Sequence, residues 1–374
     1  MSRPTLDNWL SAEHVFWSFR HVRELIPTAQ VDSGDQARPL GVALDPSLGN
    51  LPVETSTGAT SVEEFLKDSH TDSLTVLKGN DIVFEWVTDG MSNNEQHLIF
   101  SVTKSITSLL TGALVGAGKI NVDSLVTDYI PEIAGSGFDG ATIRNLLDMT
   151  ASYSFVEDYT PGPDILAYRY SVGWYPAPLD AMNLHQFIAS RTPDGPHGDH
   201  FRYQSPTTDL LGWVCEAASG LPYAEALSHY IWKPLGAQAP AHMTVDRAGS
   251  PRAAGGLSVL PRDMARVGMI IRDGGLGIVP AEYITDIFEG GSHEQWANGD
   301  FADLFENGVY RSCCYRPGED PDVIMGIGIY GQMLYIDRPR GIIIAKQSAW
   351  PMPDELEWHL DAYTLCQTIA RSLN

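Results

Sequence analysis

Positive charge is scarce in this sequence. Its 374 residues include 24 Lys and Arg against 47 Asp and Glu, which gives a formal net charge of −23. Only six of the basic residues are lysine. A surface this acidic repels phosphate groups, so we expect neither nucleic acid nor an anionic membrane as a partner.

Cysteine is also sparse, and its placement argues against two kinds of site. Neither a zinc site nor a disulfide framework fits the four positions, because they contain no Cys-x-x-Cys pair. A Gly/Pro-rich run holds His197, Asp199 and His200, but these lack the helical spacing of a zinc site. We expect no metal, no other cofactor and four free thiols, at Cys215, Cys313, Cys314 and Cys366.

Long apolar runs are missing as well. The longest candidate for a membrane span, residues 99–115, contains Lys104 and several hydroxyl groups, and the first residues lack the apolar core of a secretion signal. We therefore predict a cytoplasmic protein. With 43% hydrophobic and 19% charged residues, the chain has the composition of an ordinary globular protein with a large core.

The most informative run is residues 97–110, which holds the only Ser-x-x-Lys of the chain, Ser101 and Lys104. In a helix these side chains lie one turn apart on the same face. An amine beside a serine at a helix start can take the hydroxyl proton, and the helix terminus favours the negative charge that develops. Ser101 is therefore the predicted nucleophile. No Gly-x-Ser-x-Gly occurs, which argues against esterases built on a nucleophile elbow.

Hydrophobic periodicity predicts strands at both ends of the chain and helices between them. Helical patterns cover residues 9–25, 62–68 (with Ser61 as N-cap), 141–149, 209–218, 262–271 and 355–373. Strands are expected at 74–77 and 82–87, joined as a hairpin, and at 323–329, 332–336 and 341–346. Residues 27–58 and 159–178 are expected to be irregular, the first wrapping a surface and the second lining a pocket.

Four further blocks, in order and at consistent spacing, resemble the serine β-lactamase-like and penicillin-recognising hydrolases. They are residues 118–132, 142–150, 201–236 (with Tyr203-Gln204-Ser205) and 254–266. Three C-terminal blocks, at 290–294, 326–332 and 348–351, narrow the resemblance to aminohexanoate-oligomer hydrolases, near the family VIII carboxylesterases. Those enzymes cleave linear amides and esters.

The resemblance implies a fold and a division of the chain. The fold is α/β, of the β-lactamase/transpeptidase type, with an antiparallel sheet flanked by helices and built from both chain ends. We expect the sheet domain to comprise residues 1–104 and 252–374, with an inserted, mostly helical domain at 105–251. The sheet domain would carry an edge strand at Ile329 and the helical domain would carry Tyr203, with the site in the crevice between them.

The chemistry requires a nucleophile, a base and donors for an oxyanion. Tyr203 is one candidate for the base, because a phenol near a fixed ammonium has its ionised form favoured. Lys104 either supplies that ammonium or takes the proton itself, and the sequence leaves both roles open. The resemblance implies that the backbone N–H groups of Ser101 and Ile329 form the oxyanion hole, and that Trp174 lines the substrate pocket.

Departures from the family patterns bear on the substrate. Where β-lactamases carry Lys-Thr-Gly, residues 329–332 offer no cation, which disfavours penicillins. Phe155 and Ala254 stand where aminohexanoate-oligomer hydrolases place a hydroxyl and an amide near the leaving amine, and Tyr330 replaces a histidine. Losing those polar groups weakens amide cleavage more than ester cleavage.

We therefore predict a serine hydrolase that forms an acyl-enzyme with short carboxylic esters and turns over linear amides weakly or not at all. Its partner would be that small molecule, and a homodimer is left open. The alternatives are a β-lactamase-type amide hydrolase and a catalytically inactive, ligand-binding member of the fold. Retention of Ser101, Lys104 and Tyr203 favours the enzyme over the inactive member.

Overall fold

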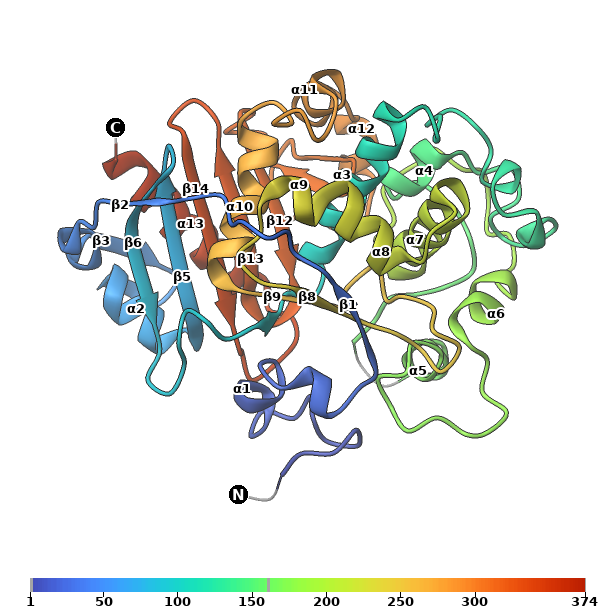
Figure 1. Ribbon diagram of the computed structural model, residues 1–374, viewed down its shortest axis with the longest axis horizontal. Coiled ribbons are helices and arrows are strands. Elements are labelled where there is room, and N and C mark those ends of the chain that lie inside the picture. Colours follow the sequence, from blue (N-terminus) through green and yellow to red (C-terminus); the bar gives the residue numbers. More distant parts are fainter. Residues whose placement is uncertain (1–2, 160–161, 374) are drawn as a thin grey trace.

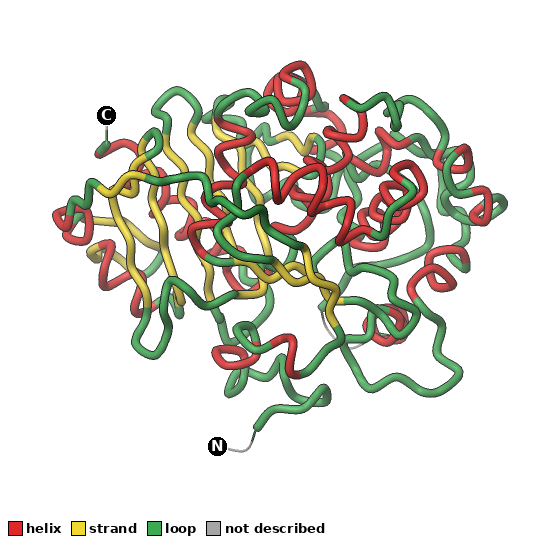
Figure 2. Tube along the Cα trace, in the orientation of Figure 1, coloured by secondary structure: helices red, strands yellow, loops and turns green. Residues whose placement is uncertain are grey.

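The computed structural model describes residues 3–159 and 162–373. Figure 1 shows most strands gathered in one half of the molecule and most helices from the middle of the chain in the other half. Figure 2 shows the same division by secondary structure. The α/β architecture with antiparallel sheets and flanking helices is therefore confirmed.

Strands from both ends of the chain form one eight-stranded sheet, in the order β10-β11-β12-β13-β14-β5-β6-β2. All its pairs are antiparallel except β2 with β6. The seam between the two ends is the β5–β14 pair, where Val76 lies opposite Ile344. The strands are β2 (Gly41–Val42), β5 (Thr71–Lys78), β6 (Asp81–Val87), β10 (Val309–Arg311), β11 (Cys314–Arg316), β12 (Val323–Gly328), β13 (Gln332–Asp337) and β14 (Ile342–Ser348).

Helices cover both faces of this sheet, which is why its central strands are buried along their length. On one face Gly268 of helix α10 (Pro261–Arg272) meets Ile343, so closely that an added Cβ would lie 2.7 Å from that side chain. On the other, Cys366 of α13 (Leu356–Ser372) contacts Met333. Alternation along the strands places Ile343 and Met333 on opposite faces, because Met333 pairs with Lys346.

A second sheet of four short strands connects distant parts of the chain in the order β1-β8-β9-β7. It consists of β1 (Thr28–Val31), β7 (His97–Leu98), β8 (Ala241–Thr244) and β9 (Leu257–Val259), and a separate hairpin is formed by β3 (Pro52–Thr55) and β4 (Gly58–Ser61). Strand β7 leads directly into the helix that carries Ser101 and Lys104.

That helix, α3 (Val102–Gly116), lies at the centre of the molecule, with Val102 to Leu114 all buried. It contacts β12 of the large sheet on one side and α7 (Ser205–Ser219) of the helical half on the other. A helix that is buried on every side must be covered by neighbours in this way, although it carries Lys104 and several hydroxyl groups. The remaining helices are α1 (Val15–Ser18), α2 (Val62–Asp68), α4 (Ile143–Leu147), α5 (Pro163–Ser171), α6 (Leu184–Ala189), α8 (Tyr223–Leu227), α9 (Lys233–Leu235), α11 (Ala281–Glu289) and α12 (His293–Ala297).

Most sequence-based elements are confirmed, and four are wrong in part. The pattern at 9–25 yields only α1 and a 3-10 turn at Val22–Glu24. Residues 27–58, expected to be irregular, contribute β1 and β2, which pair with the distant strands β8 and β6, and β3, which forms a hairpin with β4. Residues 159–178 include the helix α5. Strand β12 is not an edge strand, since β10 and β11 lie beyond it.

The domain boundaries at 104/105 and 251/252 stay a prediction, although β8 falls inside the range predicted to be helical and pairs with β1 and β9. Among residues 3–159 and 162–373, no helix combines the length and apolarity needed to cross a bilayer.

Candidate active site

Ser101 is the N-cap of α3, at the end of a strained turn. Phe100, just before it, has φ of 42°, in the left-handed region that side chains other than glycine rarely adopt. The turn directs the chain from β7 into the helix and brings the Ser101 side chain, 8% exposed, to the wall of a pocket. Strain of this kind persists only where surrounding structure holds it, and it is frequent at functional sites.

Lys104 lies one turn further along α3, and its side chain is buried. Its Nζ donates hydrogen bonds to Ser101 Oγ (2.8 Å), Ser205 Oγ (2.9 Å) and the carbonyl oxygen of Ala254 (2.8 Å). The predicted pairing of Ser101 with Lys104 is therefore present in the structure. Burial lowers the pKa of Lys104 to about 8, against the opposing effect of Glu157. A substantial fraction of its amine is thus neutral in mildly alkaline solution.

Tyr203 comes from the segment before α7, with its hydroxyl close to the Ser101 side chain. Its ring lies 4.9 Å from Lys104 Nζ. The three predicted catalytic side chains thus lie next to one another. However, burial and the Glu157 carboxylate raise the pKa of Tyr203 well above its usual value, against the lowering effect of its hydrogen bond with Ser101. The phenol is therefore held neutral, contrary to the expectation that the ammonium would favour its ionised form.

Glu157 is a site residue that the sequence analysis missed. It is half-buried, and its Oε1 accepts a 2.6 Å hydrogen bond from Ser205 Oγ while its Oε2 accepts one from the Ser205 backbone N–H. A single hydroxyl therefore separates this carboxylate from the Lys104 ammonium. Glu157 lies just before the segment expected to line the pocket, but no spacing in the sequence places it beside residue 205.

The predicted oxyanion hole is framed by two backbones in close contact. Ile329 follows β12 in a short 3-10 turn, Ile329–Gly331. At Gly328 an added Cβ would lie 2.9 Å from the Ile99 carbonyl oxygen and 3.1 Å from Ser101 N, so only glycine lets the strand end approach the turn at Ser101 this closely. The described residues are 3–159 and 162–373. Among their backbone hydrogen bonds, apart from those within helices and strands, none is donated by the N–H of Ser101 or of Ile329.

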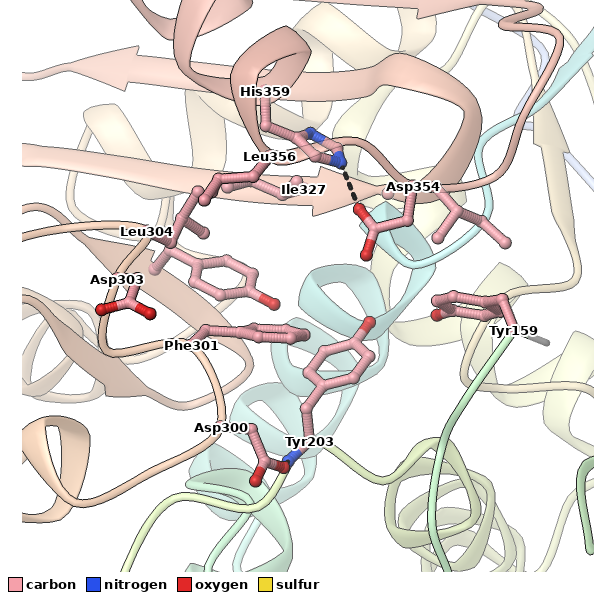
Figure 3. Close-up of a pocket in the computed structure, with 13 residues that line it drawn as sticks. Tyr159, Tyr203, Asp300, Phe301, Asp303, Leu304, Ile327, Asp354, Leu356 and His359 are labelled. Carbon is pink, nitrogen blue, oxygen red and sulfur yellow. Dashed lines mark hydrogen bonds and ion pairs between the residues drawn. The ribbon is translucent and has the colours of Figure 1, made fainter.

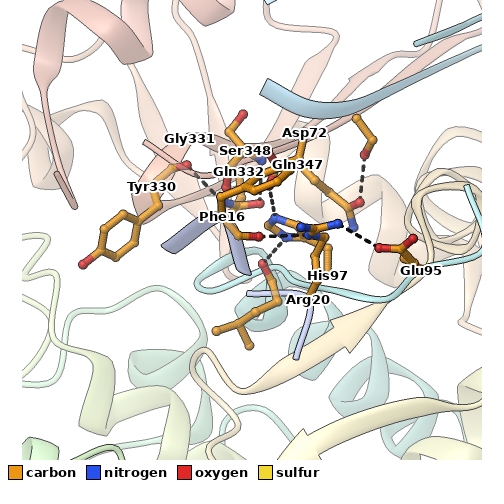
Figure 4. A network of polar contacts seen from close by, with 12 residues as sticks. Phe16, Arg20, Asp72, Glu95, His97, Tyr330, Gly331, Gln332, Gln347 and Ser348 are labelled. Atoms are coloured by element: carbon orange, nitrogen blue, oxygen red, sulfur yellow. Dashed lines mark hydrogen bonds and ion pairs between the residues drawn. The ribbon is translucent and has the colours of Figure 1, made fainter. Parts of the chain in front are cut away.

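A buried amide fixes the turn at Ile329, as Figure 4 shows. Gln332 Nε2 donates to the carbonyl oxygens of Ser348 (2.7 Å) and Tyr330 (3.1 Å), and its Oε1 accepts from Ser348 N (3.2 Å). Tyr330 itself has φ of 60°, a second left-handed residue beside a predicted oxyanion donor. Aromatic packing supports both strained residues, since Phe19 packs edge-on against Phe100 (4.7 Å between ring centroids) and Tyr330 (4.9 Å).

Gly328 therefore offers a direct test of this hole. Replacing it with alanine is expected to push Ile329 away from Ser101 and to reduce kcat by about 10²–10³-fold, the loss typical of one oxyanion donor. Gly34→Ala is the control, because a Cβ at Gly34 would meet its nearest atom at an ordinary 3.6 Å. Steady-state kinetics on an ester substrate would measure both variants, and an unchanged kcat in Gly328→Ala would place the oxyanion elsewhere.

Two cavities meet at the Ser101 region. The acidic pocket, about 220 Å³, is shown in Figure 3, where Asp354 hydrogen-bonds to His359 across the opening from Tyr203. The acidic pocket is lined by Tyr159, Tyr203, Asp300, Phe301, Asp303, Leu304, Tyr315, Ile327, Gly328, Ile329, Asp354, Leu356 and His359, with no lysine or arginine among them. The smaller aromatic pocket, about 40 Å³, is bounded by Ser101, Phe100, Trp174, Tyr330, Arg252 and eleven other residues.

Of the four residues predicted to contact the substrate, two line a pocket of the site and two do not. Trp174 and Tyr330 line the aromatic pocket. Phe155 lines neither pocket, because its ring packs in the core against Tyr168 and its neighbours. Ala254 takes part through its backbone, accepting from Lys104 Nζ and donating its N–H to Asp209 (2.8 Å).

Two cations that line the aromatic pocket, Arg169 and Arg252, were also missed. Arg252 is buried and donates to Asp209 (2.7 Å). Its guanidinium lies over the rings of Tyr168 and Trp174. The four cysteines are buried free thiols, as expected, and the described residues include no group of three or more His, Cys, Asp and Glu placed to hold a metal.

Comparison with known proteins identifies the family. Residues 59–362 match the beta-lactamase family model. Over 364 residues the chain is 36% identical to the 6-aminohexanoate-dimer hydrolase of Paenarthrobacter ureafaciens, an alignment that covers 95% of this chain and 91% of the relative.

Solved structures agree with this. A Bacillus anthracis protein assigned provisionally as a 6-aminohexanoate-dimer hydrolase superposes with a TM-score of 0.89 and 26% identity, over 99% of this chain and 97% of that one. A family VIII carboxylesterase shares the fold, with a TM-score of 0.60 and 15% identity over 81% of this chain and 96% of the other.

Proposed function

This chain belongs to the beta-lactamase family and is a hydrolase of that fold, and within it we propose a serine hydrolase that forms an acyl-enzyme with short carboxylic esters and linear amides. The observation that carries the proposal is the hydrogen bond from Lys104 Nζ to Ser101 Oγ (2.8 Å), with the Tyr203 ring 4.9 Å from the same amine. A buried amine with a lowered pKa beside a serine hydroxyl is the arrangement that activates such a nucleophile.

Lys104 is the base in this mechanism. Its neutral amine takes the Ser101 proton as Oγ bonds to the substrate carbonyl carbon, and the resulting oxyanion is held by the N–H groups of Ser101 and Ile329. The bond to the leaving oxygen or nitrogen then breaks, and that atom takes the proton through the Tyr203 hydroxyl. Water, deprotonated by the same amine, attacks the ester carbon. The bond to Ser101 Oγ then breaks, Oγ takes the proton back from Lys104, and the carboxylic acid is released.

The pockets favour a linear substrate without a carboxylate near the reacting carbon. The acidic pocket, with Asp300, Asp303 and Asp354 in its lining, repels anionic groups. Penicillins carry a carboxylate beside the scissile amide, so their hydrolysis is disfavoured. A neutral or cationic chain suits this pocket, and esters are expected to react faster than amides because an alkoxide needs less help in leaving than an amine.

A fluorophosphonate probe and three substrates test the proposal. The probe is expected to label folded wild-type protein at Ser101, found by mass spectrometry, and to leave Ser101→Ala unlabelled. Turnover should be fastest with p-nitrophenyl butyrate, slower with the linear aminohexanoate dimer, and absent with nitrocefin. Unlabelled wild-type protein would support the inactive, ligand-binding alternative, and fastest turnover of nitrocefin would support the β-lactamase.

A further inference from the structure

Glu157 reaches the start of α7 from another part of the chain. The N-cap of α7, Gln204, makes no side-chain hydrogen bond to the helix. Instead both Glu157 carboxylate oxygens accept from Ser205, one from its backbone N–H and one from its hydroxyl (2.6 Å). The Tyr159 hydroxyl also donates to Oε1 (3.3 Å). The carboxylate is thus held in place by the helix terminus, where negative charge is favoured.

These contacts fix the direction of the hydrogen bond between Ser205 and Lys104. A serine hydroxyl has one proton, and an ionised carboxylate can only accept. Because the Ser205 proton is committed to Glu157, Ser205 Oγ can only accept from Lys104 Nζ (2.9 Å). The Ala254 carbonyl oxygen is likewise an acceptor only, at 2.8 Å.

The consequence appears when Lys104 is neutral. A neutral amine has two N–H bonds and one lone pair, and both N–H bonds are taken by Ser205 and Ala254. The remaining position faces Ser101 Oγ, 2.8 Å away, so the lone pair is aimed at the proton to be removed. If Ser205 were free to donate, its proton would compete for that lone pair.

We propose that Glu157 is a positioning residue: by holding the Ser205 proton, it orients the Lys104 amine toward Ser101. The inference rests on the proposed function, in which Lys104 is the base. It adds a carboxylate to the machinery, one that acts through Ser205 and contacts neither the nucleophile nor the oxyanion donors.

The charge of Glu157 also acts on the pKa of Lys104, and this second effect works against the first. The other charged or titratable groups acting on Lys104 are Arg252, Asp209 and Cys313, and the Tyr203 ring lies against the amine. Asp209 is bound by Arg252 at 2.7 Å, which leaves Glu157 as the leading group that favours the ammonium and raises its pKa. Glu157 therefore orients the lone pair of the Lys104 amine toward Ser101. It also reduces the fraction of Lys104 that is neutral at a given pH.

Glu157→Gln separates the two effects. Wild-type kcat/KM on an ester is expected to rise through pH about 8 as Lys104 loses its proton. In the variant this rise should move by about one pH unit or more to lower pH, because the opposing charge is gone. The plateau of kcat should fall by about 10–100-fold because the amine is misaligned. KM should change little, because Glu157 acts on the base.

Three variants control for a purely structural role. Ser205→Ala removes the connection but keeps the charge, so its plateau should fall without the shift to lower pH. Glu157→Asp keeps the charge on a shorter side chain, so its pH profile should stay close to wild type, with part of the plateau restored. Asp354→Asn removes a carboxylate paired with His359 in the acidic pocket, and should leave the midpoint of the rise in place.

The outcomes separate this inference from the proposed function. If fluorophosphonate labels Ser101 and wild-type protein turns over esters, but the Glu157→Gln profile superimposes on wild type or moves to higher pH, Glu157 does not position Lys104. A lower plateau without a shift in Glu157→Gln also overturns the inference. If wild-type protein neither reacts with the probe nor turns over ester, the proposed function itself has failed.

Discussion

Replacing Lys104 with methionine is expected to reduce kcat for ester hydrolysis by about 10³–10⁴-fold, near the upper end of what one general base contributes. Methionine keeps much of the buried volume while removing the amine that contacts Ser101. Fluorophosphonate labelling of Ser101 should slow in parallel, because attack by Ser101 Oγ requires loss of its proton. Stopped-flow labelling and steady-state kinetics on p-nitrophenyl butyrate would measure the two losses.

The chain provides a matched control in Lys346. This second buried lysine also has a pKa lowered to about 8 by burial, but it donates to Ser348 Oγ (2.5 Å) and the Gly331 carbonyl oxygen (3.2 Å) rather than to Ser101. Lys346→Met should lower the free energy of unfolding yet retain probe labelling of Ser101. Equal loss of labelling in both variants would show that a buried lysine is needed for the fold and not for the base.

The largest expected effect on stability is at the ion pair between His97 and Asp72. His97 Nδ1 lies 2.8 Å from the Leu98 carbonyl oxygen and Nε2 lies 2.8 Å from Asp72 Oδ2, so both ring nitrogens face oxygen atoms (Figure 4). Both side chains are almost fully buried. Asp72→Asn is expected to lower the free energy of unfolding by about 3–5 kcal/mol, because removing one partner of a buried pair leaves the other without compensation in the core.

A double-mutant cycle measured by urea denaturation would test this pair. Asp72→Asn combined with His97→Gln should cost less than the sum of the single changes, because the double variant leaves no unpaired charge in the core. A loss below about 1 kcal/mol for Asp72→Asn would mean that the two groups do not form an ion pair.

Local signals in the sequence were sufficient for several elements. Ser61 caps α2 by accepting from Glu64 N (3.2 Å), which a serine three residues before a glutamate predicts. The β5–β6 hairpin follows from two apolar runs around Gly79, whose φ of 59° suits glycine. Strands β13 and β14 and helix α13 were placed within about two residues, the usual uncertainty of helix and strand ends.

The elements that were missed depend on distant partners. Strand β1 is only four residues long and exists because it pairs with β8, more than two hundred positions away. Its composition alone resembles a loop.

Helix α5 was missed for a different reason. It lies in a Pro- and Gly-rich segment whose prolines indicated irregular structure, although Pro163 opens the helix at a position where proline is tolerated.

The residues of the site likewise fall into those that the sequence identifies and those that only tertiary packing brings together. Ser101 and Lys104 are one helical turn apart, so the sequence places them together, and Tyr203 was found through family motifs. Glu157 and Arg252 reach the cleft only through tertiary packing, and no local pattern identifies them. The electrostatics of Tyr203 were misjudged because burial, which raises its pKa, outweighs the nearby ammonium.

Because the large sheet is assembled from both ends of the chain, it can be completed only late in synthesis. Strand β5 leaves the ribosome long before β14, its neighbour in the sheet, and the hydrogen bond between Ser73 and Gln347 joins residues 274 positions apart. Until translation is nearly complete, β5 presents an unpaired apolar edge of the kind that recruits other nascent chains. Premature termination before β14 would therefore yield an aggregating product rather than a weakly active hydrolase.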